Sequence, residues 1–406
     1  MTSVEGFSPS FALCLAFILL VPFAIAGVAL INTGLGRSRS AAQAMTSSLC
    51  VICVAALIFF VWGFAIQNYP VHVDAGSAGL FFRGVQFGSP SSLVVVLSIF
   101  SVALASLIPL GGATDRWRLG AACASTILLA GFTYPLFARV AWRSLGFTQW
   151  MDAGGAASIQ VTGGLTALSI TWLLGPRHGK YSPKGVPAAI PAHNGVFVIF
   201  GCMLAWIGWL GLNSAGAILY AGIQPEKSVL VVINTTFAAA AAGLTAAAIT
   251  RVRFRKPDAS LIANGWMAGL VASSSGCAAL KPATAILTGL VAGALVVLSV
   301  EVLEFTLKVD DPCGSVSVHA VAGLWGVLAA GIFAGGPGQF MAQLVGVATQ
   351  LGFVLPLAYG SNWLLGRFVP HRVSIDGERQ GLDLHELGAD AYPEFVVHAD
   401  EFMQRQ

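Results

Sequence analysis

The chain has 406 residues, of which 56% are hydrophobic and only 10% are charged, and its net charge at neutral pH is +3. Soluble domains have about 25% charged residues, so the composition excludes an ordinary soluble protein, and the small net charge gives no reason to expect a nucleic-acid partner. The 47 glycines are typical of membrane helices that pack closely through small residues. The composition therefore indicates a membrane protein that crosses the bilayer many times.

Apolar stretches long enough to cross a bilayer recur along the chain as far as residue 366. Their lengths and the charged gaps between them predict eleven transmembrane helices, at 9–33, 46–67, 91–110, 117–139, 154–174, 194–213, 227–250, 260–278, 283–305, 316–334 and 340–366. The first stretch has no basic region before it and no evident cleavage site after it. We therefore predict a retained helix, with a signal peptide as the less favoured alternative.

The basic residues are distributed unevenly between the loops. Twelve Lys and Arg follow the odd-numbered spans, and five follow the even-numbered spans. Because positive charges are enriched in cytoplasmic loops, the N-terminus is predicted to lie outside and the tail, 367–406, in the cytoplasm. That tail is polar and carries eight acidic residues, so we divide the chain into a membrane domain, 1–366, and a cytoplasmic tail.

Two short stretches at the fifth and tenth predicted spans share one pattern. Residues 152–165 read DAGGAASIQVTGGL, and residues 311–324, 159 positions later, read DPCGSVSVHAVAGL. The two agree at Asp, Gly, Ser, Gly and Leu, but Gln160 stands where the second copy has His319. The odd offset of five spans makes the second copy cross the membrane in the opposite sense, as in transporters built from inverted repeats.

Gln160 and His319 are therefore predicted to face each other in the interior, near the middle of the bilayer. A histidine inside a membrane is costly to bury and by default suggests a functional site. Its polar counterpart favours a pore or binding role for the pair; the alternative is a histidine that only bonds to a neighbouring helix. Asp152 is expected to cap the fifth span and to fix the backbone beside an outer cation site, and Asp311 to cap the tenth.

The remaining residues give little sign of other chemistry. The seven cysteines are scattered and are interpreted as buried thiols, with disulfides or a metal site as the less favoured alternative. The sequence shows no P-loop, no nucleophile–base pair and no metal-ligand cluster. We therefore expect neither an enzyme nor a cofactor.

Longer motifs carry a family resemblance. Residues 192–217 read AHNGVFVIFGCMLAWIGWLGLNSAGA, with a His-Asn pair before the sixth span, where Asn194 is expected to cap the helix. The segment 310–326 reads DDPCGSVSVHAVAGLWG, and the tail at 378–393 reads ERQGLDLHELGADAYP. In this order the motifs resemble the Amt/Mep/Rh ammonium transporter family along essentially the whole chain.

The resemblance implies a homotrimer with one narrow pore in each subunit, in the inner membrane of a bacterium. In the family, ammonium is captured in an outer vestibule, partly by an aromatic face, and loses its proton before ammonia crosses an apolar pore past paired histidines. A PII-type regulatory protein can block bacterial members from inside. The basic loops at 177–184 and 251–256 are candidates for its docking surface; the alternative is that these charges only set the topology.

Several family positions are kept in this sequence. The resemblance places His319 at the second pore histidine, Asp152 at the aspartate before the fifth span, and Ser274 where the family usually has threonine. Trp142 falls at the outer-site tryptophan if the loop after it is two residues shorter than usual; an ordinary interfacial tryptophan is the alternative.

Other positions depart from the family pattern. Gln160 occupies the first histidine position, Gly216 the position of the outer-site serine, and Leu212 that of one gate phenylalanine. The other gate position falls at Ser101, with Phe100 next to it. We therefore expect a weaker outer polar site and a gate of different shape.

Gln160 bears most directly on the mechanism. An amide cannot be protonated near neutral pH, so Gln160 can hold one tautomer of His319 but cannot accept a proton, and any relay between two histidines is altered or absent. We predict an ammonium or ammonia transporter that captures and deprotonates ammonium in the outer vestibule. The alternatives are a weakly transporting ammonium sensor, favoured by the replaced pore residues, and a channel for another small neutral molecule. No output domain is expected after the tail, which favours transport.

Overall fold

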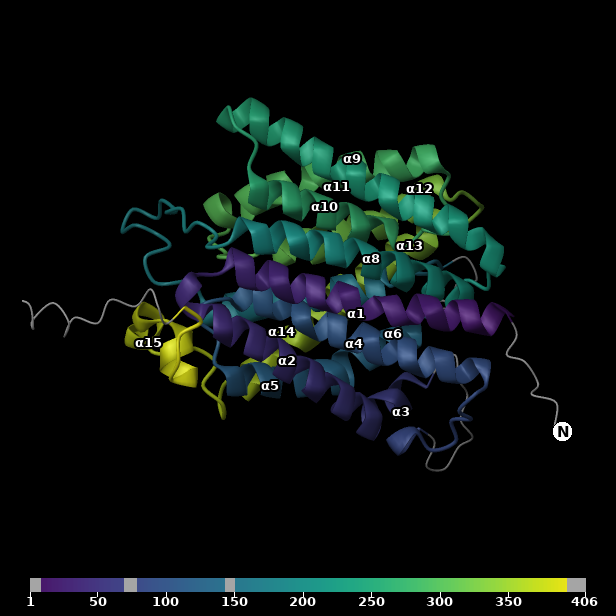
Figure 1. Cartoon of the computed structure of the whole chain (residues 1–406), viewed down its shortest axis with the longest axis horizontal. Helices are drawn as coiled ribbons and strands as arrows, with labels where there is room; N and C mark the ends of the chain where they lie inside the picture. The colour runs from purple at the N-terminus through teal and green to yellow at the C-terminus, as the bar shows by residue number, and fades with distance from the viewer. Residues whose placement is uncertain (1–8, 69–78, 143–149, 393–406) are drawn as a thin grey trace, which may run out of the picture.

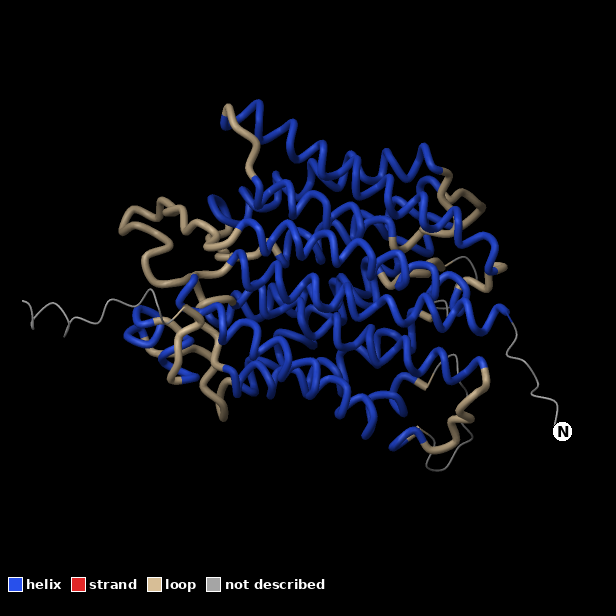
Figure 2. The backbone as a smooth tube through the Cα atoms, in the orientation of Figure 1, coloured by secondary structure: helices blue, strands red, loops and turns tan. Residues whose placement is uncertain are grey.

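The structure is a computed structural model that describes residues 9–68, 79–142 and 150–392. Within these ranges the chain is nearly all helix, and the loops gather at the two ends of the helical bundle (Figure 2). The strand-like pairings in the described residues are two isolated bridges, between Trp117 and Arg372 and between Tyr181 and Pro187. The predicted all-helical class is confirmed.

The helices follow one another as rods with short connections. In chain order they are α1 (Pro9–Leu35), α2 (Ala41–Ile58), α3 (Phe64–Gln67), α4 (Pro90–Ala113), α5 (Leu119–Leu128), α6 (Tyr134–Ala141), α7 (Thr162–Leu174), α8 (Gly195–Tyr220), α9 (Ser228–Phe254), α10 (Ala259–Ser273), α11 (Pro282–Glu301), α12 (Ala322–Phe333), α13 (Gln339–Thr349), α14 (Leu355–Leu365) and α15 (Ile375–Gln380). Wider π-type turns occur at Phe59–Gly63, Leu129–Thr133, Ala156–Val161, Val302–Thr306, Val316–Val321, Gln350–Val354 and Asp383–Leu387. Such turns are frequent at functional sites, and those before α7 and α12 contain Gln160 and His319.

Ten helical segments in the described chain are long and apolar enough to cross a membrane. They correspond to ten of the predicted spans, although some bounds differ: the second segment runs from Ser38 to Gln67, so it begins earlier than expected. The remaining predicted span corresponds to α10, whose 15 residues are fewer than the hydrocarbon core of a bilayer requires. A total of eleven crossings and the N-out orientation therefore stay predictions.

The predicted span at 260–278 is wrong at its C-terminal end. The helix stops at Ser273, and residues 274–280 form mostly buried turns. There the backbone carbonyl of Ser274 accepts a hydrogen bond of 2.7 Å from the N–H group of Gly154. In a continuing helix that carbonyl would accept the N–H group four residues later, whereas here it accepts an N–H group from a distant segment of the chain. Irregular backbone of this kind is tolerated in membrane proteins where it is buried in protein or lines a cavity.

Helices α1 and α8 lie side by side along the molecule (Figure 1). The N–H groups of His193 and Asn194, just before α8, bond to the carbonyls of Gly36 (3.2 Å) and Gly34 (3.1 Å) at the end of α1, so the two helices are antiparallel. Asn194 caps α8 as expected, because its Oδ1 accepts the N–H of Phe197 at 3.0 Å. The end of the bundle that holds α15 is termed the tail side, and the opposite end the far side (Figure 1).

The C-terminal segment docks on the tail side through acidic side chains. Asp383 accepts the N–H groups of Ala42 (3.1 Å) and Gln43 (2.7 Å) in the first turn of α2. Glu386 accepts the N–H of Leu119 (2.7 Å) at the start of α5. Helix N-termini present unsatisfied N–H groups and partial positive charge, so these carboxylates stabilise both helices. The tail therefore connects two helices of the N-terminal half.

Candidate functional site

Gln160 and His319 meet in the interior of the bundle. Gln160 Oε1 lies 2.8 Å from His319 Nδ1, Gln160 is fully buried, and His319 is 5% exposed. A carbonyl oxygen only accepts, so with the amide in this orientation His319 Nδ1 donates the proton of the bond. The neutral imidazole then has no proton on Nε2, which is free to accept a hydrogen bond.

The same local structure positions both side chains. The carboxylate of Asp152 accepts hydrogen bonds of 2.9 Å from two backbone N–H groups at the start of the turn Ala156–Val161. The carboxylate of Asp311 accepts bonds of 2.9 and 2.8 Å from two N–H groups at the start of the turn Val316–Val321. Each aspartate therefore caps the segment that carries one member of the pair.

A glycine follows each aspartate at the same distance. Gly155 has a φ of +79° and Gly314 a φ of +70°, the left-handed backbone region that residues with a Cβ seldom adopt. These bends direct the chain from the capping aspartate into the helix. The sequence repeat is thus a repeat of local backbone structure.

The two copies begin at opposite ends of the bundle. Asp152 lines a cavity beside Tyr220, the last residue of α8, whereas Asp311 lines a second cavity beside Ala192, just before α8 begins. The helices α7 and α12 therefore run in opposite senses, as an inverted repeat requires. They cross closely at Gly164, where a Cβ would lie only 2.3 Å from the backbone nitrogen of Ala320. The absence of a side chain at this position therefore permits the close approach.

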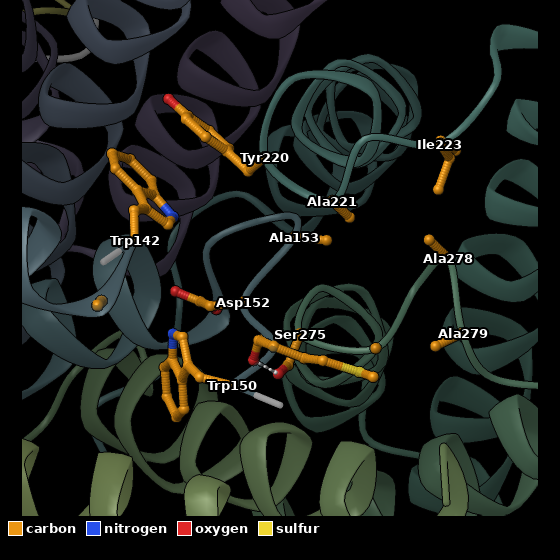
Figure 3. A pocket seen from close by; sticks show the side chains of 13 residues that line it. Trp142, Trp150, Asp152, Ala153, Tyr220, Ala221, Ile223, Ser275, Ala278 and Ala279 are labelled. Atoms are coloured by element: carbon orange, nitrogen blue, oxygen red, sulfur yellow. Dashed lines mark hydrogen bonds between the residues drawn. The ribbon is translucent and has the colours of Figure 1, made fainter. Parts of the chain in front are cut away.

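The far-side cavity has a volume of about 400 Å³ and an aromatic wall (Figure 3). Its larger lining residues are Trp142, Trp150, Met151, Asp152, Tyr220 and Ile223. Burial raises the pKa of Asp152, and its bonds to backbone N–H groups oppose that shift. The structure thus brings two of the expected site residues, Trp142 and Asp152, to one cavity; the loop at 143–149 lies outside the described residues.

Three other expected site residues lie away from the lining of this cavity. Leu212 is buried in the main hydrophobic core, and Phe100 packs against that core with part of its surface exposed. Ser274 is also buried, and its hydroxyl accepts the indole N–H of Trp209 at 3.1 Å. Ser274 therefore ties two helices together in the packed interior.

Gly216 packs directly against the segment that carries Asp152. A Cβ at this position would lie 2.1 Å from the backbone carbonyl oxygen of Ala153. The serine of the family pattern does not fit here without a backbone shift. The cavity accordingly has no hydroxyl group from position 216.

Tyr220 and Trp150 are candidates that no sequence motif indicated. Tyr220 stacks on Trp142 with ring centroids 4.1 Å apart and planes inclined by 13°. The indole nitrogens of Trp142 and Trp150 have no hydrogen-bond partner among the described residues, although the two residues are only 7% and 9% exposed. Their only signal in the sequence is an aromatic residue close to the end of an apolar span, which is common in membrane proteins.

The tail-side cavity has a volume of about 380 Å³ and a charged wall. Its charged lining residues are Arg177, Lys180, Asp258, Glu304, Asp310 and Asp311. The two cavities thus lie at opposite ends of the bundle; the first is lined mainly by aromatic and small residues, and the second combines apolar residues with several charged ones.

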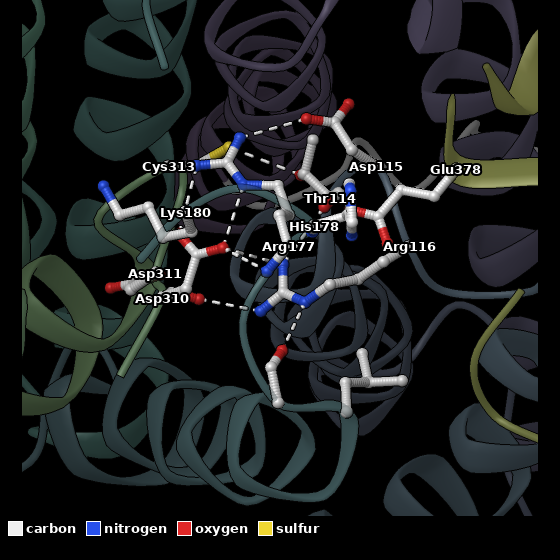
Figure 4. Close-up of polar contacts among 12 residues, drawn as sticks. Thr114, Asp115, Arg116, Arg177, His178, Lys180, Asp310, Asp311, Cys313 and Glu378 are labelled. Carbon is white, nitrogen blue, oxygen red and sulfur yellow. Dashed lines mark hydrogen bonds and ion pairs between the residues drawn. The ribbon is translucent and has the colours of Figure 1, made fainter. Parts of the chain in front are cut away.

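Buried charge pairs lie beside the tail-side cavity (Figure 4), and of their members Arg177 and Asp310 line it. Arg177 donates to Asp310 at 2.9 and 3.1 Å and to Asp115 at 3.0 Å, and Arg116 donates to the backbone carbonyl of Asp310 at 2.7 Å. Burial alone would raise the pKa of Asp310, but Arg177 and Arg116 lower it to about 2. From the sequence, both arginines contributed to the predicted topology and Arg177 also to a candidate docking surface; in the fold they hold the loops together.

The described residues offer hydrogen bonding and charge rather than a metal centre. No group of three or more His, Cys, Asp or Glu in the described ranges is placed to hold a metal ion, and the seven cysteines are free thiols. A buried amide–imidazole pair with a cavity toward each end of the bundle suits the passage of a small polar molecule.

Comparisons with known proteins agree with this geometry. The sequence profile of the Ammonium Transporter Family matches residues 12–392. The chain is 32% identical to ammonium transporter Amt2 of Archaeoglobus fulgidus, over 94% of this chain and 88% of that protein. It is 27% identical to an ammonium transporter of Bacillus subtilis, over 92% of this chain and 96% of that protein.

Solved structures show the same arrangement of helices. A structure named Sensor Amt Protein superimposes with a TM-score of 0.85 at 25% identity, covering 93% of this chain and 98% of that one. Candida albicans Mep2 superimposes with a TM-score of 0.81 at 22% identity, covering 96% of this chain and 92% of that one, which shows a common fold.

Proposed function

The chain belongs to the ammonium transporter family, and we propose that it moves ammonium or ammonia across a membrane through a pore that passes Gln160 and His319. The family and the ten apolar segments make it an integral, multi-pass membrane protein. The proposal rests mainly on the buried 2.8 Å contact between the two side chains, with a cavity toward each end of the bundle.

In the proposed path, ammonium enters the far-side cavity, which the charge pattern predicts to face outside. The negative charge of Asp152 and the indole of Trp142 attract the cation, and a cation over an indole gains about 0.5–2 kcal/mol depending on desolvation. A bare ion in the apolar interior would be far less favourable than that gain. Ammonium therefore transfers its proton to water in this cavity, and the neutral ammonia continues into the pore.

Ammonia then meets a donor and an acceptor. The free Nε2 of His319 can accept an N–H of ammonia, and the amide Nε2 of Gln160, which has no partner among the described residues, can donate to its lone pair. Of the two side chains, only His319 can carry a proton. The pair thus matches a small neutral molecule that both donates and accepts.

We extend the proposal to a homotrimer in the inner membrane of a bacterium, with a PII-type protein binding on the tail side. Of the two basic loops considered for that surface, the first contains Arg177 and Lys180, which are buried and paired with acids. Residues 251–256, which form the last turn of α9 and the two residues after it, are exposed and are the better candidate, although Arg253 pairs with Glu301.

Currents from proteoliposomes on a solid-supported membrane after an ammonium jump test the transport proposal. Ammonia alone carries no charge, so a current requires that the released proton also crosses, and His319 is the one member of the pair that can carry it. We expect such a current in wild type, its loss in His319→Ala, and no change in His178→Ala, which alters an exposed histidine outside the pair. Gln160→His restores a second titratable ring, so a larger current in that variant would show that the amide limits charge movement. If wild type gives neither a current nor a flux of uncharged ammonia reported by an internal pH dye, the transport proposal is contradicted.

Ammonium sensing is the second candidate function. A neighbouring fold is named Sensor Amt Protein, and Gln160 replaces a titratable pore residue, which favours weak transport. Calorimetric binding of ammonium without any flux in the same preparation would support sensing. Flux of another small neutral molecule without ammonium flux would support the third alternative, a channel of different selectivity.

A further inference from the structure

In the far-side cavity, the indole of Trp142 is covered by aromatic side chains of the same chain. The Tyr220 ring lies parallel to the indole of Trp142, 4.1 Å away between centroids, on the side turned toward α8 (Figure 3). Tyr134 packs against the same indole at 80°, with centroids 6.4 Å apart. Trp142 keeps only 7% of its surface exposed, which leaves little of either face for an ion.

We propose that Tyr220 sets the affinity of this cavity for ammonium by covering the face of Trp142 on which the cation binds. A cation is attracted to the face of an indole at about 6 Å or less from the ring centroid. The Tyr220 ring occupies that space in the structure, so ammonium has to displace it. This inference rests on the proposed function, because it requires ammonium to enter through the far-side cavity.

Tyr220 is placed where its ring can move. It is the last residue of α8, and its hydroxyl lies 3.4 Å from the Oγ of Ser98 on α4, a long hydrogen bond. As a residue Tyr220 is half-buried, and it borders a cavity of about 400 Å³ into which the ring can shift. Aromatic stacking and cation–π contacts are similar in strength, so the ring competes with the ion without excluding it.

The other groups in and beside the cavity offer the cation no equal substitute. Gly216 supplies no hydroxyl and has no space for one beside the carbonyl of Ala153. Asp152 attracts the cation through its charge, but both of its carboxylate oxygens already accept backbone N–H groups, so it is less available for direct contact. The unpartnered indole N–H groups of Trp142 and Trp150 are donors, which attract acceptors and not cations. The covered indole face is therefore the main reserve of cation affinity in this cavity.

The half-saturating ammonium concentration for flux into proteoliposomes tests the inference with the full chain. Tyr220→Ala uncovers the indole and is expected to lower this concentration about 3- to 10-fold, a change of about 0.7–1.4 kcal/mol. Tyr220→Phe keeps the stacked ring and is the matched control, expected to stay within about twofold of wild type. Combining Tyr220→Ala with Trp142→Ala should abolish the gain, because no indole is left to uncover.

Two results would overturn the inference. One is an unchanged half-saturating concentration in folded Tyr220→Ala, and the other is an equal gain in the double variant, which would assign the effect to a wider cavity. Gel filtration and the thermal midpoint identify a misfolded variant, and Tyr220→Val then takes its place with the same expectation. Failure of the proposed function is distinguishable, since wild type and every variant would then show no ammonium flux.

Discussion

Gln160 and His319 differ in what each can do with a proton. An imidazole gains and loses a proton near neutral pH, whereas an amide does not. Their 2.8 Å contact holds the imidazole in the tautomer with a bare Nε2. A relay that passes a proton from one ring to the next needs a second titratable ring, which this pair lacks. Any current through the protein must therefore move its charge by His319 alone or by another route.

Gly216→Ser tests whether packing excludes the outer hydroxyl. A Cβ at position 216 would lie 2.1 Å from the carbonyl oxygen of Ala153. We expect the free energy of unfolding to fall by about 1–3 kcal/mol, as in other overpacked sites. Thermal unfolding in detergent measures the change. Gly360→Ser is the control, because no atom lies within 4 Å of a Cβ there; equal midpoints for the two variants would contradict the packing argument.

At the scale of single residues, the sequence predicted that Gln160 and His319 meet but not which ring faces Trp142. Matched positions of an inverted repeat lie near its axis, and this rule identified Gln160 and His319. No comparable rule connects Trp142 with Tyr220, which comes from a different helix. A shift of one residue, from Ser101 to Phe100, also turns a helical side chain to another face. Phe100 accordingly packs outside the cavity lining.

At the scale of the helices, the lengths of the apolar stretches predicted the positions of the helical segments well, but they misplaced the C-terminal end of one. Ten predicted spans correspond to long apolar helical segments, because hydrophobicity directly reflects burial in lipid or protein. The span predicted at 260–278 stops early, at the point where the carbonyl of Ser274 bonds to Gly154, a residue far away in the sequence. Serine and glycine are common in membrane helices, so composition alone does not reveal such a stop.

The buried charge pairs between the tail-side loops predict acid sensitivity. Arg177 and Arg116 lower the pKa of Asp310 to about 2 against the effect of burial. The pKa of a free aspartate is about 3.9. Since the folded-state pKa is the lower one, the carboxylate stabilises the fold above about pH 4, and this contribution of about 2–3 kcal/mol is lost as the pH falls toward 2. The stability difference between wild type and Asp310→Asn should shrink over the same range.

Asp311→Asn is the matched control for this pH dependence. Burial raises the pKa of Asp311 to about 6, so the fold disfavours its ionised form. Wild type should therefore lose stability relative to Asp311→Asn as the pH rises from about 4 to 6, the opposite direction and a higher window. Urea unfolding at several pH values measures both differences. A constant difference for Asp310→Asn across the acid range would show that its charge is unimportant for stability.

At the scale of the whole molecule, the C-terminal segment links helices that are far apart in the sequence. Asp383→Ala removes the acceptor for two N–H groups in the first turn of α2. We expect a cost of about 1–2 kcal/mol, as for other lost helix caps, and faster hydrogen exchange in that turn with no change in α9. Asp376→Ala changes an exposed acid in the same segment and is the control. Equal exchange in the two variants would argue against a clamping role for the tail.

The class, the family and the multi-pass character could all be predicted from the sequence. Composition indicated the membrane, and long motifs in a fixed order indicated the family, which the profile match confirms. The docking of the tail was less accessible, because acids such as Asp383 and Glu386 read as solvent-exposed charges until the helix ends that they cap are known. Trimer formation depends on contacts between copies and stays a proposal.

The matched motifs headed by Asp152 and Asp311 also bear on the direction of travel. With two identical copies, a molecule entering from either end would meet the same groups in the same order. Replacing one imidazole by an amide removes this equivalence, so the energy profile seen from one end is no longer the mirror image of the profile seen from the other. The rates of inward and outward transport then differ under concentration gradients of equal size and opposite direction. The equilibrium that both approach is the same. In the proposed path, the pairing of Gln160 with His319 thus adds a directional difference at the centre to the one already made by the two unlike cavities at the ends.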